Sequence, residues 1–287
     1  MTLSTILNYY VDTVNIGAPA VKKIQNNSLV SKYGPYALVT GASEGIGRSF
    51  AEELAKAGFE VILVARRTDL LDEIAKGLEE QYGVMCPVIS ADLTKTEDLE
   101  DVFCKIKELD IGLLVCNAGF GSAGNFLDSD LSTELNMLSL NCATLTAMTH
   151  YFGRKFQAKG KGGIILLSSI VAMQGVARSA HYSATKAYVH SLGEALQEEW
   201  EGHGVDLLIV APGPVETGFA SRARMELGNA ATPDTVAREA MAGLGYKKVV
   251  RPGWLAKILA FALATVPRWA KVKIMSSVMN GMTKRLP

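Results

Sequence analysis

The sequence predicts an α/β protein in which helices cover both faces of a parallel, doubly wound sheet. Short apolar runs alternate with longer amphipathic runs along most of the 287 residues, which is typical of strands joined by crossover helices. The apolar runs are nearly continuous, as expected for strands buried on both faces. A glycine-rich turn at residues 41–47 links the first strand to the first helix. In this fold class, such a turn is where a ligand binds.

The expected elements follow one another closely, and no repeat or linker divides them. Strands are expected at residues 36–40, 60–64, 84–90, 111–116, 163–167 and 205–210, with an edge strand at 247–250. Helices are expected at residues 46–57, 69–81, 96–107, 131–156 and 182–201, and from Thr232 onward. Pro87 weakens the third strand because proline has no N–H to donate. Gly58 and Gly202 end two of the helices, and Thr232 followed by Pro233 is a typical helix start.

The chain extends beyond this single domain at both ends. We place the domain at residues 34–252, after an N-terminal extension at 1–33 whose role the sequence leaves open. A C-terminal extension at 253–287 is basic and contains no acidic residue. Its apolar residues recur at helical spacing and predict one broad stripe. They are Trp254, Leu255, Ile258, Leu259, Ala262, Leu263 and Val266.

Two roles are open for this stripe. Most amphipathic stripes in globular proteins face a core, so we favour packing on the domain, at a ligand pocket or at a subunit contact. The alternative is peripheral contact with an anionic membrane, which suits an apolar face beside basic residues. The basic residues are Lys257, Arg268, Lys271, Lys273, Lys284 and Arg285.

Composition excludes several classes of protein. The chain has 29 basic and 29 acidic residues, and no strongly basic face or tail points to nucleic acid. The four cysteines and four histidines show no metal-ligand spacing, and the cysteines read as reduced thiols of a reducing compartment. The N-terminus does not resemble a secretory signal, and no uncharged apolar run reaches membrane-spanning length. We therefore expect a cytoplasmic protein without a metal site.

The turn at residues 41–47 is suited to a diphosphate. Gly41, Gly45 and Gly47 lie between an apolar strand and an amphipathic helix, and this context makes a glycine motif meaningful. Glycine lets the backbone turn sharply and lets a ligand approach closely. The free N–H groups and the dipole at the start of the helix then favour an anion.

A second motif pairs Tyr182 with Lys186 one helical turn later. Tyrosine, with an ordinary pKa of about 10, is a poor proton donor at neutral pH, and a nearby cation lowers that pKa. Upstream, Ser168 and Ser169 end a strand at the edge where ligands bind, and a serine hydroxyl there can hold a carbonyl oxygen. Asn117, with Ala118 and Gly119 after it, ends another strand at the same edge.

Together these motifs closely resemble the short-chain dehydrogenase/reductase family over about residues 36–220. The resemblance includes the family's order of motifs, which ends with a Pro-Gly-x-Val-x-Thr segment. It implies a Rossmann-like fold and catalytic roles for Asn141, Ser169, Tyr182 and Lys186. Tyr182 is the implied general acid or base, Lys186 holds the nicotinamide ribose, Ser169 binds the substrate oxygen and Asn141 anchors a relay water. The implied cofactor-binding residues are Gly41, Ser43, Glu44, Gly45, Ile46, Gly47, Arg66, Arg67, Asp92, Leu93, Asn117, Ala118, Gly119, Tyr182, Lys186, Pro212, Gly213, Val215 and Thr217.

The end of the second strand favours NADP(H) over NAD. An NAD site places a carboxylate there for the ribose hydroxyls, whereas this chain has Arg66 and Arg67. A guanidinium suits the additional phosphate of NADP(H). Glu44 weakens this argument, because many NADP-dependent members of the family have a basic residue at its position.

We therefore expect an NADP(H)-dependent oxidoreductase that acts on a small-molecule ketone or secondary alcohol, with a fatty acyl or steroid-like compound as the substrate class. The alternative is a cofactor-binding regulatory or sensor protein on the same fold. A serine hydrolase is excluded because the chain contains no Gly-x-Ser-x-Gly segment. The resemblance also implies a homo-oligomer, either a dimer or a tetramer.

Overall fold

A computed structural model describes residues 28–218 and 230–283. Most of the N-terminal extension, Lys284 and Arg285 lie outside the described residues. So do residues 219–229; the segment 219–231 follows Thr217, and from the sequence we expect it to cover the substrate pocket.

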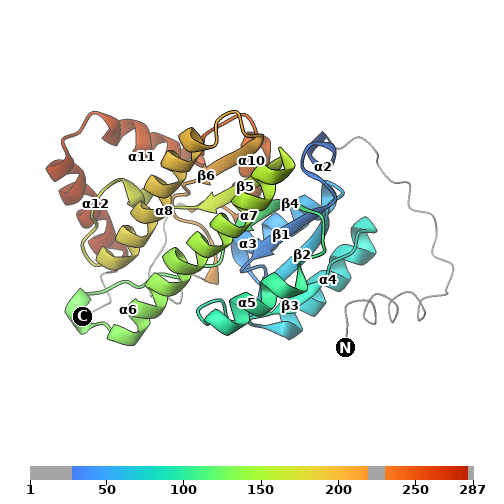
Figure 1. Cartoon of the computed structure of the whole chain (residues 1–287). Coiled ribbons are helices and arrows are strands. Elements are labelled where there is room, and N and C mark those ends of the chain that lie inside the picture. The colour runs from blue at the N-terminus through green and yellow to red at the C-terminus, as the bar shows by residue number, and fades with distance from the viewer. Residues whose placement is uncertain (1–27, 219–229, 284–287) are drawn as a thin grey trace.

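The described chain contains a seven-stranded parallel sheet with the strand order β3-β2-β1-β4-β5-β6-β7 (Figure 1). The strands are β1 (Tyr36–Thr40), β2 (Glu60–Ala65), β3 (Val88–Ser90), β4 (Ile111–Cys116), β5 (Gly162–Leu167), β6 (Val205–Val210) and β7 (Val249–Val250). The order reverses between β1 and β4, and ligands bind at such a switch point, outside the carboxyl ends of the strands. The predicted doubly wound sheet is confirmed.

Helices cover both faces of the sheet. One face packs against α3 (Gly45–Lys56), α4 (Thr68–Tyr82) and α10 (Pro233–Gly243), through buried residues such as Phe50 and Val236. The other face packs against α5 (Thr96–Lys105), α7 (Leu145–Lys159) and α8 (Ala180–Glu199), through Phe152 and Val189 among others. A short helix, α2 (Ser28–Tyr33), precedes β1. The two apolar layers hold the carboxyl ends of the strands in fixed register.

Two elements differ from the sequence-based expectation. The third strand begins at Val88 rather than at residue 84, because Pro87 cannot donate a hydrogen bond, although its carbonyl still accepts one from Leu63 N at 2.9 Å. The long helix expected at 131–156 is divided into α6 (Leu131–Leu138), a π-helical turn (Ser139–Thr144) and α7. Asn141 lies in that π turn, and such turns occur frequently at functional sites.

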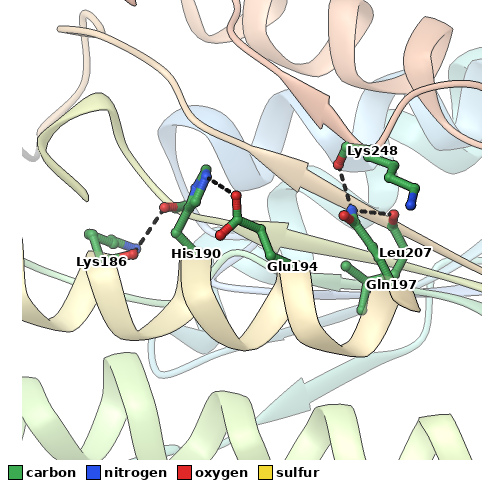
Figure 2. A network of polar contacts seen from close by, with 7 residues as sticks. Lys186, His190, Glu194, Gln197, Leu207 and Lys248 are labelled. Carbon is green, nitrogen blue, oxygen red and sulfur yellow. Dashed lines mark hydrogen bonds and ion pairs between the residues drawn. The ribbon is translucent and has the colours of Figure 1, made fainter. Parts of the chain in front are cut away.

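Helix α8 is tied to the edge of the sheet near its C-terminal end. The Gln197 amide donates hydrogen bonds to the carbonyl oxygens of Leu207 in β6, at 3.0 Å, and of Lys248 beside β7, at 2.6 Å (Figure 2). The same helix carries Lys186 and His190 nearer its start (Figure 2). Because one rigid helix carries these residues, fixing it at Gln197 also fixes the position of Lys186 over the sheet.

The C-terminal extension forms α11 (Trp254–Ala264) and α12 (Arg268–Met282). Both lie beside α8, at the end of the molecule away from α4 (Figure 1). The residues of the predicted apolar stripe are not all on the same side of the helix with respect to solvent. Leu263, with Ala256 next to the stripe, is buried in a small cluster that also holds Val171, whereas Trp254 and Ile258 are exposed. No helix among the described residues combines the length and the apolar character needed to cross a membrane.

Candidate active site

The glycine turn leaves room for a ligand above the start of α3. Gly41 has a φ of +68°, in the left-handed region that favours glycine. A Cβ on Gly47 would lie 2.2 Å from the Gly41 carbonyl oxygen and 2.5 Å from Asn117 Nδ2. Any side chain on Gly47 would therefore push the turn away from β4. The backbone at Gly47 lies so close to Gly41 that only glycine fits there. The space above the start of α3 stays open for an anion.

Thr40, at the end of β1, joins the glycine turn to the end of β4. Its Oγ1 donates to the Val115 carbonyl at 3.2 Å and accepts from the backbone N–H groups of Asn117 and Ala118, both at 3.0 Å. The Asn117 side chain donates back to the carbonyls of Thr40 and Gly41, at 3.0 and 3.2 Å. Asn117 thus holds the two strand ends together from below the cavity.

Tyr182 and Lys186 meet the end of β5. Lys186 Nζ donates to the Leu167 carbonyl at 2.7 Å and lies 5.8 Å from the centroid of the Tyr182 ring. Ser168 donates to the Lys186 carbonyl at 3.0 Å, while the hydroxyl of Ser169 hydrogen-bonds with the side chain of Tyr182. Ser168 therefore anchors the helix, and Ser169 is left beside the tyrosine.

Asn141 braces the loop after β4. Its amide donates to the Phe120 carbonyl at 2.8 Å and to Thr185 Oγ1 at 3.0 Å, and its Oδ1 accepts from Phe120 N at 3.1 Å. A Cβ on Gly119 would lie 2.8 Å from that Oδ1 and 3.6 Å from Lys186 Nζ. The π turn thus brings Asn141 close to Lys186.

The far end of the site is formed by charged residues. Arg67 Nη2 lies 2.8 Å from Glu44 Oε2 and donates to Ser43 Oγ at 3.0 Å, so it joins the end of β2 to the glycine turn. Burial alone would raise the pKa of Asp92, but hydrogen bonds from Thr94 and the charge of Arg66 bring it below its ordinary value. This end therefore combines two guanidinium groups with an ionised carboxylate.

One cavity of about 460 Å³ runs from these arginines to Tyr182. It is lined by Ser169, Tyr182, Lys186 and every cofactor-binding residue that the sequence predicted except Gly47. Gly47 and Asn141 lie behind the wall and support it. Val215 and Thr217 also line the cavity. Thr217 packs against the glycine turn, because its Cγ2 lies 2.9 Å from the position that a Cβ on Gly45 would occupy. Among the described residues, no cluster of His, Cys, Asp or Glu could hold a metal ion.

Comparison with known proteins shows which family has this sequence and this fold. The family model for short chain dehydrogenases matches residues 35–227. The chain belongs to the short-chain dehydrogenase family. It is 32% identical over 259 residues to the very-long-chain 3-oxoacyl-CoA reductase of Macaca fascicularis, covering 88% of this chain and 81% of that protein. It is also 32% identical over 235 residues to a 7beta-hydroxysteroid dehydrogenase of Collinsella aerofaciens, covering 79% of this chain and 89% of that protein.

Solved structures agree with this placement. A structure from a study of 7beta-hydroxysteroid dehydrogenase stereoselectivity matches with a TM-score of 0.80 and 29% identity, covering 86% of this chain and 98% of that one. A short-chain dehydrogenase from Sphingobium yanoikuyae in complex with NADPH matches with a TM-score of 0.74 and 30% identity, covering 84% and 95%. The protein is thus an oxidoreductase with a Rossmann-like fold and a site for a nicotinamide cofactor.

In this dehydrogenase, the pKa values of Tyr182 and Lys186 both depart from their ordinary values. Burial raises the pKa of Tyr182 to about 12, and the hydrogen bond with Ser169 offsets only part of this effect. Burial also lowers the pKa of the Lys186 ammonium to about 8. In the protein without cofactor, burial therefore favours the neutral forms of both Tyr182 and Lys186.

The substrate end of the cavity includes residues that sequence reasoning missed. Met275, Met279 and Met282 of α12 and Leu259 of α11 line it. The methionines recur at intervals of four and three residues, which places them on one helical face. That spacing could have indicated a functional face, but only the tertiary structure shows that it covers Tyr182.

We expect Thr40→Val to destabilise the dehydrogenase by about 1–3 kcal/mol more than Thr40→Ser. The valine leaves the N–H groups of Asn117 and Ala118 without their acceptor in a region where Thr40 is buried. Serine keeps the hydroxyl and loses only a methyl group. Urea unfolding of both variants measures the difference. Equal losses would show that the hydroxyl does not hold the strand ends together.

We expect the stability of the cofactor-free protein to depend on pH through Lys186. Its pKa is about 8 when folded and 10.5 when unperturbed, so folding releases a proton between these values. The cost of burying the ammonium is complete below pH 8 and declines as the pH rises toward 10.5. Between pH 7.5 and 9.5 the wild type should therefore gain about 2 kcal/mol relative to Lys186→Met. Urea unfolding at a series of pH values tests this, and parallel profiles for the two proteins would contradict it.

Proposed function

We propose that this protein is an NADP(H)-dependent carbonyl reductase or alcohol dehydrogenase for an apolar substrate. One observation carries the proposal: a single cavity joins a glycine-lined cradle at one end to Tyr182, Ser169 and Lys186 at the other. A sensor of the cofactor needs only the cradle. The presence of a proton-transfer group in the same cavity favours chemistry over sensing.

The residues present fit a nicotinamide dinucleotide. The turn at Gly41 and Gly47 has no space for side chains but leaves the start of α3 open, which suits a diphosphate. Asp92 and the arginines suit the adenosine end, and Lys186 suits the nicotinamide ribose. When bound, the cofactor supplies or accepts the hydride.

Tyr182 is the proposed general acid for ketone reduction and the base for alcohol oxidation. Its hydroxyl shares a hydrogen bond with Ser169, so one carbonyl oxygen can accept from both hydroxyl groups. A tyrosine pKa of about 12 is well suited to hold the proton but poorly suited to release it. The charge of the Lys186 ammonium would lower the Tyr182 pKa, and in alcohol oxidation a bound oxidised nicotinamide would add to that charge.

The apolar substrate class is supported by the lining and by the relatives. Leu259, Val278 and three methionines form the wall facing Tyr182. Methionine is unbranched and flexible, so such a wall adapts to long or bulky apolar groups. The two curated relatives are named for a very-long-chain 3-oxoacyl-CoA and for a hydroxysteroid. Both names describe a ketone or alcohol on a large apolar frame.

The preference for NADP(H) rests on Arg66. Arg67 is paired with Glu44, so the charge of the glutamate that weakened the sequence argument is compensated within the site. Arg66 lines the cavity beside Asp92 and has no ion pair among the described residues. A guanidinium in that place favours a ribose phosphate. The solved relative from Sphingobium yanoikuyae binds NADPH.

We expect Tyr182→Phe to reduce turnover at least ~100-fold while NADPH still binds, because the change removes the transferable proton and little else. The measurement is NADPH oxidation with a panel of steroid-like and fatty acyl ketones. Tyr188→Phe is the matched control, since that tyrosine is exposed and hydrogen-bonds only with Thr146 among the described residues. Turnover by Tyr182→Phe close to that of the control would refute the proposed mechanism.

We expect Arg66→Ala to weaken NADPH binding about 10- to 100-fold, the effect of losing a hydrogen bond to a charged group, and to leave NADH binding nearly unchanged. Titration of nicotinamide fluorescence with both cofactors measures this. Arg154→Ala, an exposed arginine on α7, is the control. Equal affinity of the wild type for NADPH and NADH would overturn the preference.

A further inference from the structure

The outer face of α11 carries three large apolar side chains that are each more than half exposed. Trp254, Ile258 and Phe261 lie four and three residues apart, so they share one side of the helix. They are 61%, 54% and 86% exposed. On α12, Trp269 and Ile274 are also exposed. Contiguous exposed apolar side chains of this size indicate an interaction surface.

The same surface carries positive charge. Residues 253–283 contain no acidic residue, although the whole chain has 29 basic and 29 acidic residues. Lys257 pairs with Glu239 of α10 at 2.7 Å, so the outward charge comes mainly from Arg268 and Lys273, which are exposed. Lys273 Nζ lies 5.7 Å from the centroid of the Trp269 ring. A lysine beside an exposed tryptophan suits a boundary between apolar and charged layers.

The inner faces of these helices form part of the active-site cavity. Leu259 of α11 and Met275 and Met279 of α12 line it, and Ala177 N donates to Ser276 Oγ at 2.9 Å, which ties α12 to the loop before Tyr182. Val278 both lines the cavity and is 42% exposed. The cavity edge and the outer apolar surface therefore meet on α12.

We propose that the outer faces of α11 and α12 dock on the surface of an anionic lipid bilayer. The apolar side chains enter the boundary between headgroups and acyl chains, while Arg268 and Lys273 contact lipid phosphates. The edge of the cavity at Val278 then faces the lipid, so an apolar substrate reaches Tyr182 without crossing water. This last step rests on the proposed function, whereas the docking does not.

A second copy of the chain suits this surface less well. Pairing α11 and α12 with the same helices of another molecule would place Arg268 and Lys273 of each copy at an interface where neither segment offers an acidic residue. An anionic bilayer supplies that compensation. Charge complementarity therefore favours the bilayer as the partner of the exposed face, while Leu259 and Leu263 of the stripe pack inward as the sequence favoured.

Flotation of the full chain with lipid vesicles tests the docking without any activity assay. We expect the protein to float with vesicles of phosphatidylcholine and phosphatidylserine, less with phosphatidylcholine alone, and less at 1 M salt, where the screening length falls to about 3 Å. Replacing both aromatics (Trp254→Ser with Phe261→Ser) should weaken binding at least ~10-fold, since burying one such side chain accounts for about that factor. The control is Tyr246→Ser, which removes an aromatic that is also 86% exposed but lies outside the two helices.

A second pair of variants separates charge from apolar contact. Arg268→Gln with Lys273→Gln should lower binding to the anionic vesicles and leave the weak binding to neutral vesicles unchanged, while Lys107→Gln with Lys161→Gln should change neither. All replaced side chains are exposed, and circular dichroism checks that the variants fold. Absence of flotation, or flotation that the aromatic variants do not weaken, would overturn the proposal. So would self-association lost in the aromatic variants, because the partner would then be a second copy.

Discussion

The hydroxyl of Thr40 holds together the two strands between which the active site opens. β1 and β4 pair as neighbours as far as Val39 and Val115, the strand order reverses between them, and Thr40 lies directly beyond the paired residues. Thr40 and Asn117 join them by hydrogen bonds to backbone groups on both sides. The glycine turn rests directly on this junction, which is why Gly47 cannot carry a side chain. The binding of an anion above α3 therefore depends on an arrangement of backbone groups that lies beneath the cavity.

At the other end of the cavity, burial disfavours the charged forms of Lys186 and Tyr182, the two groups that we propose for proton transfer. The Lys186 ammonium is buried and donates to the Leu167 carbonyl, and burial moves the pKa values of Lys186 and Tyr182 in opposite directions, away from their charged forms. Such opposed shifts are typical of functional sites. At neutral pH only the Lys186 shift is a stability cost, because Tyr182 is neutral in both the folded and the unfolded chain. In the mechanism that we propose, Tyr182 would become an effective acid or base when further positive charge enters the site.

The C-terminal helices have one face that is buried against the domain and one face that is exposed. Their inner residues, including Ala256 and Met279, complete an apolar cluster beside Tyr182, while Trp254 and Phe261 point outward. A helix that is apolar on nearly all sides is expected either deep in a core or in contact with lipid. In α11 one side packs in this cluster and the other is exposed, and the bilayer that we propose would cover the exposed side.

The sequence by itself determined the sheet, the order of its elements and the motif residues, because strand burial, glycine turns and helical spacing are local patterns. Tyr182 and Lys186 could be paired from their spacing alone, and all of the residues predicted for the cofactor except Gly47 line one cavity. Only the tertiary structure decided three things. The pairing of Glu44 with Arg67 joins segments that are distant along the chain. The pKa of Tyr182 is set by burial, which spacing does not reveal. The methionine face of α12 lies over the cavity because the chain folds back from the far edge of the sheet, and no local pattern records that contact.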